Sequence, residues 1–128
     1  MPVRVADASA LAAVLFLEPG AESIAERLDN AQLVAPRLLE LEIANVCLTK
    51  VRRHHADRAK LLRGWDRFRR LDVVFLDLDP GRVMSVAEET GLTVYDASYL
   101  LLARDQGVDL VTLDRRLAEA YRVSPGTP

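Results

Sequence analysis

Residues 3–20, VRVADASALAAVLFLEPG, combine a short strand-like run, one aspartate and a helix-like run. Residues 3–6 form a short apolar run that ends at Asp7, which predicts a first strand. Residues 9–17 have the composition of a helix, and the breaker pair Pro19-Gly20 ends it. An acidic side chain therefore stands at the junction between a strand and the helix that follows.

The same order of strand and helix recurs along the rest of the chain. Short apolar runs predict further strands at residues 33–35, 73–76 and 110–112. Helices are predicted at residues 21–28, 36–46, 50–70, 80–90, 95–103 and 115–121. Strands that are apolar throughout are typical of a parallel sheet covered on both faces. We therefore expect an α/β fold, a three-layer α/β/α sandwich around a four- or five-stranded, mainly parallel sheet.

Length and composition indicate one small globular domain. The chain has 128 residues, so residues 1–128 are expected to form a single unit. Half of them are hydrophobic, enough to bury a core without disulfide or metal staples. The single cysteine, Cys47, lies in an apolar run and has no partner, which indicates a reducing compartment. No signal peptide and no run long enough to span a membrane is visible, so we expect a cytoplasmic protein.

Positive charge is concentrated in one segment of an otherwise acidic chain. The net charge is −2, but residues 50–70 hold nine lysines and arginines against two aspartates. Such a segment could bind RNA phosphates, and the candidate residues are Arg52, Arg53, Arg58, Lys60 and Arg63. The alternative is an ordinary solvated helix face, since Trp65 and Phe68 lie at helical spacing and indicate that another face packs.

Four carboxylates stand at positions that a parallel sheet would bring together: Asp7, Glu42, Asp96 and Asp114. Asp7 and Asp114 each lie between a strand and a helix, and Asp96 lies in the first turn of an apolar helix. Loops that follow parallel strands gather at the carboxyl edge of the sheet, where ligands bind. For the three aspartates, helix N-capping is the competing interpretation.

Glu42 cannot be explained as a helix cap. It lies in the middle of a predicted helix, on the apolar stripe that includes Leu38, Leu39 and Val46. A carboxylate at a core-facing position is costly unless it is paired or bound to a metal. A salt bridge, for example to Arg37, is the structural alternative.

Together, four converging carboxylates favour a site for divalent metal ions. Their mutual repulsion would raise some of their pKa values until a cation neutralised them. Hard oxygen ligands suit Mg²⁺ or Mn²⁺ rather than zinc, and four carboxylates could hold one ion or two. Such ions can activate water and stabilise charge on a phosphodiester. The chemistry that this set supports is metal-assisted phosphodiester hydrolysis.

Two other motifs are better explained without catalysis. His54-His55 could suggest a metal ligand pair, but neighbouring residues on a helix do not share a face, and we expect both to be exposed. Residues 76–80, LDLDP, contain the Asp-x-Asp pattern of some phosphatases, but the chain that follows is too short for the rest of such a domain. Asp79-Pro80 is expected to be a helix N-cap and first-turn proline. No phosphate-binding loop ending in Lys-Ser or Lys-Thr is present.

Four segments in order resemble the motifs of PIN-domain nucleases, specifically the VapC-type toxins. They are VADASAL (residues 5–11), APRLL leading to EIAN (35–39 and 42–45), LTVYDASY (92–99) and LVTLDRRL (110–117). The resemblance covers nearly the whole chain. It implies a Mg²⁺- or Mn²⁺-dependent endoribonuclease with Asp7, Glu42, Asp96 and Asp114 as catalytic, metal-binding residues. It departs from the family at the end of the chain, where only residues 121–123 remain to supply a fifth strand.

The resemblance also implies supporting residues and partners. Ser9 and Thr112 match small hydroxyl positions beside the acids, where they could orient carboxylates or water; the alternative is local capping. Asn45 matches a recurrent amide one turn after Glu42. The implied partners are an RNA substrate, a small cognate antitoxin of a type II toxin–antitoxin pair, and a second copy of the chain in a homodimer. Two other functions stay open, a catalytically silent partner-binding module and a structure-specific DNA nuclease.

Overall fold

Residues 1–123 are described by a computed structural model, and within them strands and helices alternate much as the sequence predicts. The strands are β1 (Val3–Ala6), β2 (Gln32–Ala35), β3 (Val73–Phe75) and β4 (Asp109–Val111). The helices are α1 (Ala8–Leu15), α2 (Ala21–Leu28), α3 (Leu38–Arg53), α4 (Arg58–Arg70), α5 (Pro80–Thr90), α6 (Val94–Gln106) and α7 (Arg115–Arg122), with a short 3-10 helix at His55–Asp57.

All pairs of neighbouring strands are parallel, and within residues 1–123 the sheet has four strands in the order β3-β2-β1-β4. Val5 at the centre of β1 is fully buried and pairs with Val34 of β2 and Leu110 of β4. The fifth strand that residues 121–123 could have supplied is not formed, because this part of the chain belongs to α7 and its C-cap. Leu117, Ala120 and Tyr121 follow helical spacing and pack on the core, which favours a helix over a strand.

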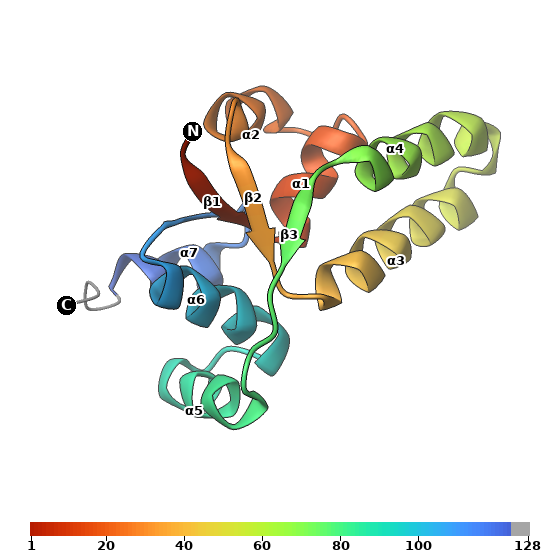
Figure 1. Cartoon of the computed structure of the whole chain (residues 1–128). Coiled ribbons are helices and arrows are strands. Elements are labelled where there is room, and N and C mark those ends of the chain that lie inside the picture. The colour runs from red at the N-terminus through yellow and green to blue at the C-terminus, as the bar shows by residue number, and fades with distance from the viewer. Residues whose placement is uncertain (124–128) are drawn as a thin grey trace.

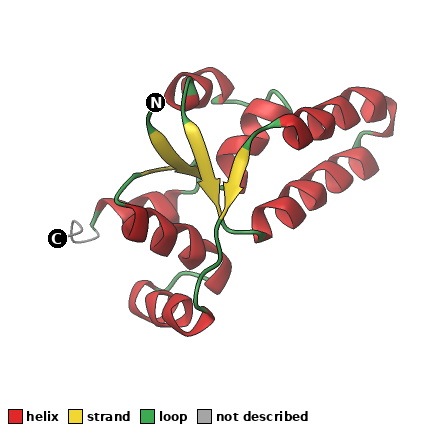
Figure 2. Ribbon diagram, in the orientation of Figure 1, coloured by secondary structure: helices red, strands yellow, loops and turns green. Residues whose placement is uncertain are grey.

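Helices cover both faces of the sheet, so the fold is a three-layer α/β/α sandwich (Figures 1 and 2). Helices α1, α3 and α4 pack together on one side, with α2 against α1, and α5, α6 and α7 pack together on the other. Helix α6 is the most buried, since every residue from 97 to 103 is inaccessible to solvent or nearly so. None of the helices in the described part of the chain combines the length and apolar character needed to cross a membrane.

The sequence predicts one helix over the basic segment, residues 50–70, and this prediction is wrong. The segment instead forms the tip and the second arm of a helical hairpin (Figure 1). Residues 50–53 are the last turn of α3, and the helix ends at His54, whose φ of −133° and ψ of 61° are not helical. The turn allows α4 to run back and bury Leu61 and Phe68 against the core. His54 and His55 are exposed in this turn, as expected, although they are not on a continuous helix.

Candidate active site

The strand order brings two of the predicted acids to neighbouring strand ends. Strand β2 lies on one side of β1 and β4 lies on the other. The loops that follow β1 and β4 therefore lead away in different directions from the carboxyl ends of these two strands. Asp7 follows β1 directly, and Thr112 and Asp114 follow β4. The amide of Asp7 donates a hydrogen bond of 3.2 Å to the carbonyl of Val111, which holds the two strand ends together. This is the position at which open α/β sheets bind ligands.

The carboxylate of Asp7 is the most buried acid of the site, at 4% exposure. Its Oδ1 accepts hydrogen bonds from the hydroxyl of Ser9 at 2.7 Å and from the amide of Ala10 at 3.0 Å, and its Oδ2 accepts one from the hydroxyl of Thr112 at 2.6 Å. Asp7 is therefore the N-cap of α1, as the capping interpretation predicts. A carboxylate offers about four acceptor positions, so the three hydrogen bonds leave one for another ligand.

Ser9 and Thr112 connect the two loops that carry the acids. Each hydroxyl donates its only hydrogen to Asp7. The hydroxyl oxygen can then accept a hydrogen bond from a backbone amide. Ser9 Oγ accepts from the amide of Leu113 at 3.0 Å, and Thr112 Oγ1 accepts from the amide of Asp114 at 3.0 Å. The two hydroxyls thus orient the carboxylate of Asp7 and also accept hydrogen bonds from local backbone amides. Ser9 and Thr112 therefore combine the two predicted roles, orientation of an acid and local capping.

Glu42 is half-buried on α3 and is held by a residue of α6. The hydroxyl of Tyr99 donates to Glu42 Oε1 at 2.5 Å, and Tyr99 itself is only 1% exposed. The salt bridge proposed as an alternative for Glu42 is absent within residues 1–123, since Arg37 pairs with Asp77 instead. Tyr99 is not among the predicted site residues; the one signal in the sequence is a phenol within the apolar run at residues 97–103.

Asp96 and Asp114 complete the set from the starts of α6 and α7. Asp114 is the N-cap of α7, because its Oδ1 accepts from the amide of Leu117 at 3.0 Å. Asp96 is not a cap: Thr93 fills that role through its Oγ1. Within the described part of the chain, the carboxylate of Asp96 accepts no hydrogen bond, and it is half-buried. Capping therefore accounts for Asp7 and Asp114 but leaves Asp96 unexplained.

The four carboxylates lie near enough to one another for their charges to repel. Burial raises the pKa of Asp7, and the charge of Asp114 raises it further, against the hydrogen bonds that lower it. Burial also raises the pKa of Glu42, with added repulsion from Asp7 and Asp96, although the Tyr99 hydrogen bond lowers it. Burial and the charges of Asp114 and Asp7 raise the pKa of Asp96. Negative charge at this edge of the sheet is thus poorly compensated.

The chemistry of these side chains fits a hydrated divalent cation. None of the four acids forms a salt bridge within residues 1–123. In the same part of the chain, no three His, Cys, Asp or Glu side chains form a ready-made metal-ligand group. This spacing is compatible with Mg²⁺, which keeps several waters and takes only one or two carboxylates directly. Asp7, Glu42, Asp96 and Asp114 are the residues that could hold such an ion, some of them through water.

The other predicted residues lie outside the cluster. Asn45 is exposed one turn after Glu42. The basic candidates Arg52, Arg53, Arg58, Lys60 and Arg63 are all exposed on the α3–α4 hairpin. With a rise of about 1.5 Å per residue, the end of α3 lies roughly 15 Å beyond Glu42 along the helix axis. None of these cations is among the charges that shift the pKa values of the four acids.

A parallel sheet with four acids at its carboxyl edge defines a class of proteins, and comparison with known proteins identifies it. Residues 4–123 match the PIN domain. The chain therefore belongs to the PIN domain family, which confirms the resemblance seen in the four sequence segments. Ribonuclease VapC3 of Pyrobaculum aerophilum is 34% identical over 122 residues, 91% of this chain and 93% of that protein. The crystal structure of PAE2754 from the same organism has a TM-score of 0.77 and 28% identity, covering 98% of this chain and 91% of that one.

Proposed function

We propose that this protein is a divalent-metal-dependent endoribonuclease that hydrolyses RNA phosphodiester bonds. The observation that carries the proposal is the meeting, at one edge of the sheet, of four carboxylates from four separate segments, none of which forms a salt bridge within residues 1–123. The relative named Ribonuclease VapC3, which aligns over nearly the whole chain, supports RNA as the substrate. A module used only for binding would gain nothing from Glu42, a half-buried acid with no cationic partner within residues 1–123.

One or two Mg²⁺ or Mn²⁺ ions would be held by Asp7, Glu42, Asp96 and Asp114. When bound, such an ion lowers the pKa of water and offsets negative charge on the phosphodiester. The chain's own residues fix the acids in place. Ser9 and Thr112 hold both oxygens of Asp7, the amide of Leu117 holds Asp114, and Tyr99 holds one oxygen of Glu42. Asp96, without such a partner in the described part of the chain, is the acid freest to adjust to substrate.

Cleavage of a mixed cellular RNA pool in Mg²⁺, Mn²⁺ and EDTA tests the proposal. We expect metal-dependent cleavage that falls at least about 100-fold in Asp96→Asn, since even the loss of an outer partner costs 10–100-fold. Asp96 is chosen because it caps no helix, so its replacement should leave the fold intact. Asp66→Asn, at an exposed position of α4, is the matched control and should cleave like the wild type.

Equal, metal-independent cleavage by all three proteins would indicate a contaminant and remove the support for catalysis. If the folded wild type cleaves no RNA in either metal, the result would favour a module that only binds a partner. Offering RNA and duplex DNA together separates the two nuclease functions, because preferential cleavage of DNA would contradict a ribonuclease.

We further propose that the enzyme is the toxin of a type II pair, held inactive by a small antitoxin and self-associated as a homodimer. The support is the relative's name, VapC3, together with the length of the chain, which is close to that of the relative. Isolation of the protein from its native cell should recover a small bound protein. Recovery of the protein alone, fully active on RNA, would contradict the toxin–antitoxin assignment but would leave the proposed ribonuclease activity supported.

A further inference from the structure

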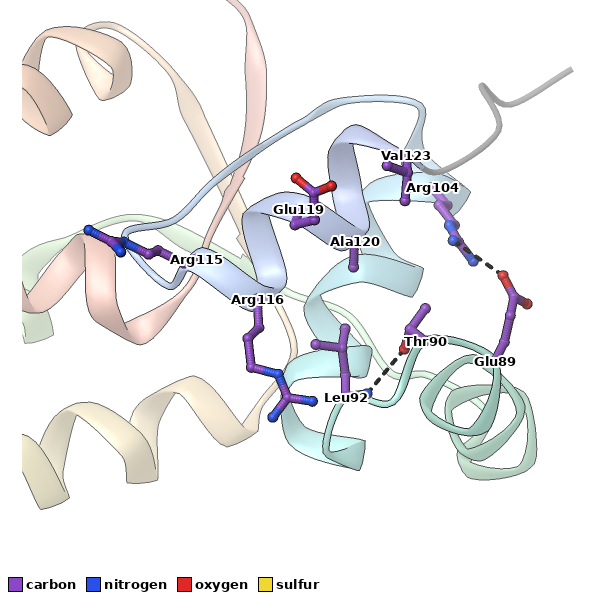
Figure 3. A pocket seen from close by; sticks show the side chains of 9 residues that line it. All are labelled: Glu89, Thr90, Leu92, Arg104, Arg115, Arg116, Glu119, Ala120 and Val123. Carbon is purple, nitrogen blue, oxygen red and sulfur yellow. Dashed lines mark hydrogen bonds and ion pairs between the residues drawn. The ribbon is translucent and has the colours of Figure 1, made fainter.

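A cavity of about 520 Å³ lies between the end of α5, the loop before α6, and α7 (Figure 3). Its volume falls within the range of about 300–1,000 Å³ that is usual for small-ligand sites. The residues that line it include arginines, two glutamates and an apolar wall formed by Leu92, Ala120 and Val123. None of the lining residues belongs to the four acids, so the cavity is distinct from the proposed catalytic site.

Positive charge in this cavity is only partly neutralised. Its two acids are already paired, Glu89 with Arg104 at 3.6 Å and Glu119 with Arg122 at 2.7 Å. Arg115 and Arg116, which also line it, form no salt bridge within residues 1–123. An anion that entered the cavity would therefore meet the guanidinium of Arg116 without having to displace a carboxylate.

Arg116 is held at the boundary between this cavity and the carboxylate cluster. Its Nη2 donates to the carbonyl of Gly91 at 2.8 Å, which fixes the guanidinium beside the loop that leads to Asp96. Arg116 lies two residues after Asp114 in the first turn of α7, and Gly91 lies in the segment between α5 and α6 that leads to Asp96, so this guanidinium stands beside the chain segments that carry both acids. Figure 3 shows Arg116 extending from α7 toward Leu92, whereas Arg115 points away on the other side of the first turn.

A nucleotide combines the two chemical features that this cavity can bind. Its phosphate pairs with the planar fork of a guanidinium better than with any other side chain. Its base has a flat face that packs on apolar or aromatic surface, which Leu92 and Ala120 offer here. An acidic peptide would match the arginines but would gain less from the apolar wall.

We propose that this cavity binds the nucleotide next to the cleaved phosphodiester of a single-stranded RNA, with Arg116 on its phosphate and the Leu92–Ala120 wall against its base. This inference rests on the proposed function, because it takes RNA as the substrate. Arg116 lies two residues after Asp114 at the start of α7, so a phosphate bound to it would place the neighbouring phosphodiester beside Asp96 and Asp114. Arg115 would contact the chain on the other side of the same helix turn.

Binding of labelled single-stranded RNA oligonucleotides in EDTA tests this directly, because it needs no catalysis. Arg116→Gln removes the charge and keeps a polar side chain, and we expect the Kd to rise about tenfold, as for loss of a hydrogen bond to a charged group. The slope of log Kd against log salt should fall by about 0.7, the value for one phosphate contact on a single strand. Arg116→Lys should recover part of both. Arg27→Gln, an exposed arginine at the end of α2, is the matched control with no expected effect.

In Mg²⁺, Arg116→Gln should raise the KM for RNA by more than it lowers kcat. The proposal is overturned if Arg116→Gln, folded by circular dichroism, binds RNA with the affinity and salt slope of the wild type and of Arg27→Gln. Unchanged RNA binding together with loss of an acidic peptide partner would assign the cavity to a protein ligand and equally overturn it. Absence of cleavage with the expected loss of RNA binding would contradict the proposed catalysis but support this site.

Discussion

The hydroxyl of Tyr99 holds one of the four acids, Glu42. Tyr99→Phe keeps the buried ring but leaves Glu42 Oε1 without its donor. We expect the affinity for Mn²⁺ to fall about 10–100-fold, as is usual for the loss of a group that holds a metal ligand. The free energy of unfolding should fall by about 1–2 kcal/mol, because a half-buried acceptor loses its partner. Isothermal titration with Mn²⁺ and urea unfolding measure the two effects.

The chain supplies a matched control for this substitution. Tyr121 also donates its hydroxyl to an acid, Asp109 at 3.2 Å, but that acid is exposed and lies at the other end of β4 from the site. Tyr121→Phe should leave Mn²⁺ affinity unchanged and alter stability by no more than about 0.5 kcal/mol. If Tyr99→Phe binds Mn²⁺ as tightly as Tyr121→Phe does, the hydroxyl does not position Glu42 for a metal.

At this scale the acids could be predicted from the sequence, but their contacts could not. Each acid stands at a position that local patterns make visible, a strand end, a first helical turn or an apolar helix face. Tyr99 and Glu42 are 57 residues apart, and nothing local indicates that α3 and α6 place them within hydrogen-bonding distance. The proposed role of Arg116 could not be predicted from the sequence either, because its position depends on a hydrogen bond to the carbonyl of Gly91, 25 residues away.

At the scale of elements, the helical hairpin of α3 and α4 is the main departure from the sequence prediction. Apolar and basic residues continue at helical spacing through residues 50–70, and no proline or glycine marks the break at His54. The break is explained by tertiary packing, since only a reversal brings Leu61 and Phe68 onto the core. Where a helix boundary is imposed by packing rather than by a breaker residue, the local sequence cannot locate it.

Gly64 makes the return of α4 possible. A Cβ at this position would lie 2.7 Å from the carbonyl oxygen of Leu15 and 2.7 Å from the ring of Phe16. We expect Gly64→Ala to lower the free energy of unfolding by about 1–3 kcal/mol through overpacking, even though alanine favours a helix by up to about 1 kcal/mol. Urea unfolding measures the change.

Gly81→Ala is the comparison for Gly64→Ala. Gly81 lies in the first turn of α5, where a Cβ would meet only Asp79 oxygens at 3.7 and 3.8 Å, an ordinary contact. This substitution should be neutral or stabilise by up to about 1 kcal/mol, because alanine has less freedom in the unfolded chain. Equal effects of the two substitutions would show that α4 does not need the close approach at Gly64.

At the scale of the whole molecule, the sheet determines which residues can act together. The alternation of apolar strands and helices predicts parallel strands, but it leaves the strand order open. The order β3-β2-β1-β4 puts β4 beside β1 and so places Thr112 against Asp7, two residues 105 positions apart. The absence of a fifth strand in residues 1–123 leaves β4 at an edge without disturbing this arrangement.

Gathering acids in this way should make the stability of the molecule depend on pH and on metal. The pKa values of Asp7, Glu42 and Asp96 are raised, chiefly by burial, from ordinary values of 3.8 for the aspartates and 4.5 for the glutamate. A carboxyl group with a raised pKa binds its proton more tightly in the folded than in the unfolded state. Its stabilising contribution is complete below the ordinary pKa and is lost as the pH rises through the raised one. Above that pH the three ionised groups oppose folding.

A divalent ion should offset this loss, and only where the acids are ionised. In EDTA, the free energy of unfolding of the wild type should fall relative to that of Asp7→Asn as the pH rises above about 4. At constant ionic strength, Mg²⁺ should raise the Tm of the wild type more at about pH 8 than at about pH 5, because the ion binds only the folded state with its acids deprotonated. Asp66→Asn should behave like the wild type in both measurements. A rise in Tm that is the same at both pH values, or the same in Asp7→Asn, would mean that Mg²⁺ acts elsewhere on the surface and not at this cluster.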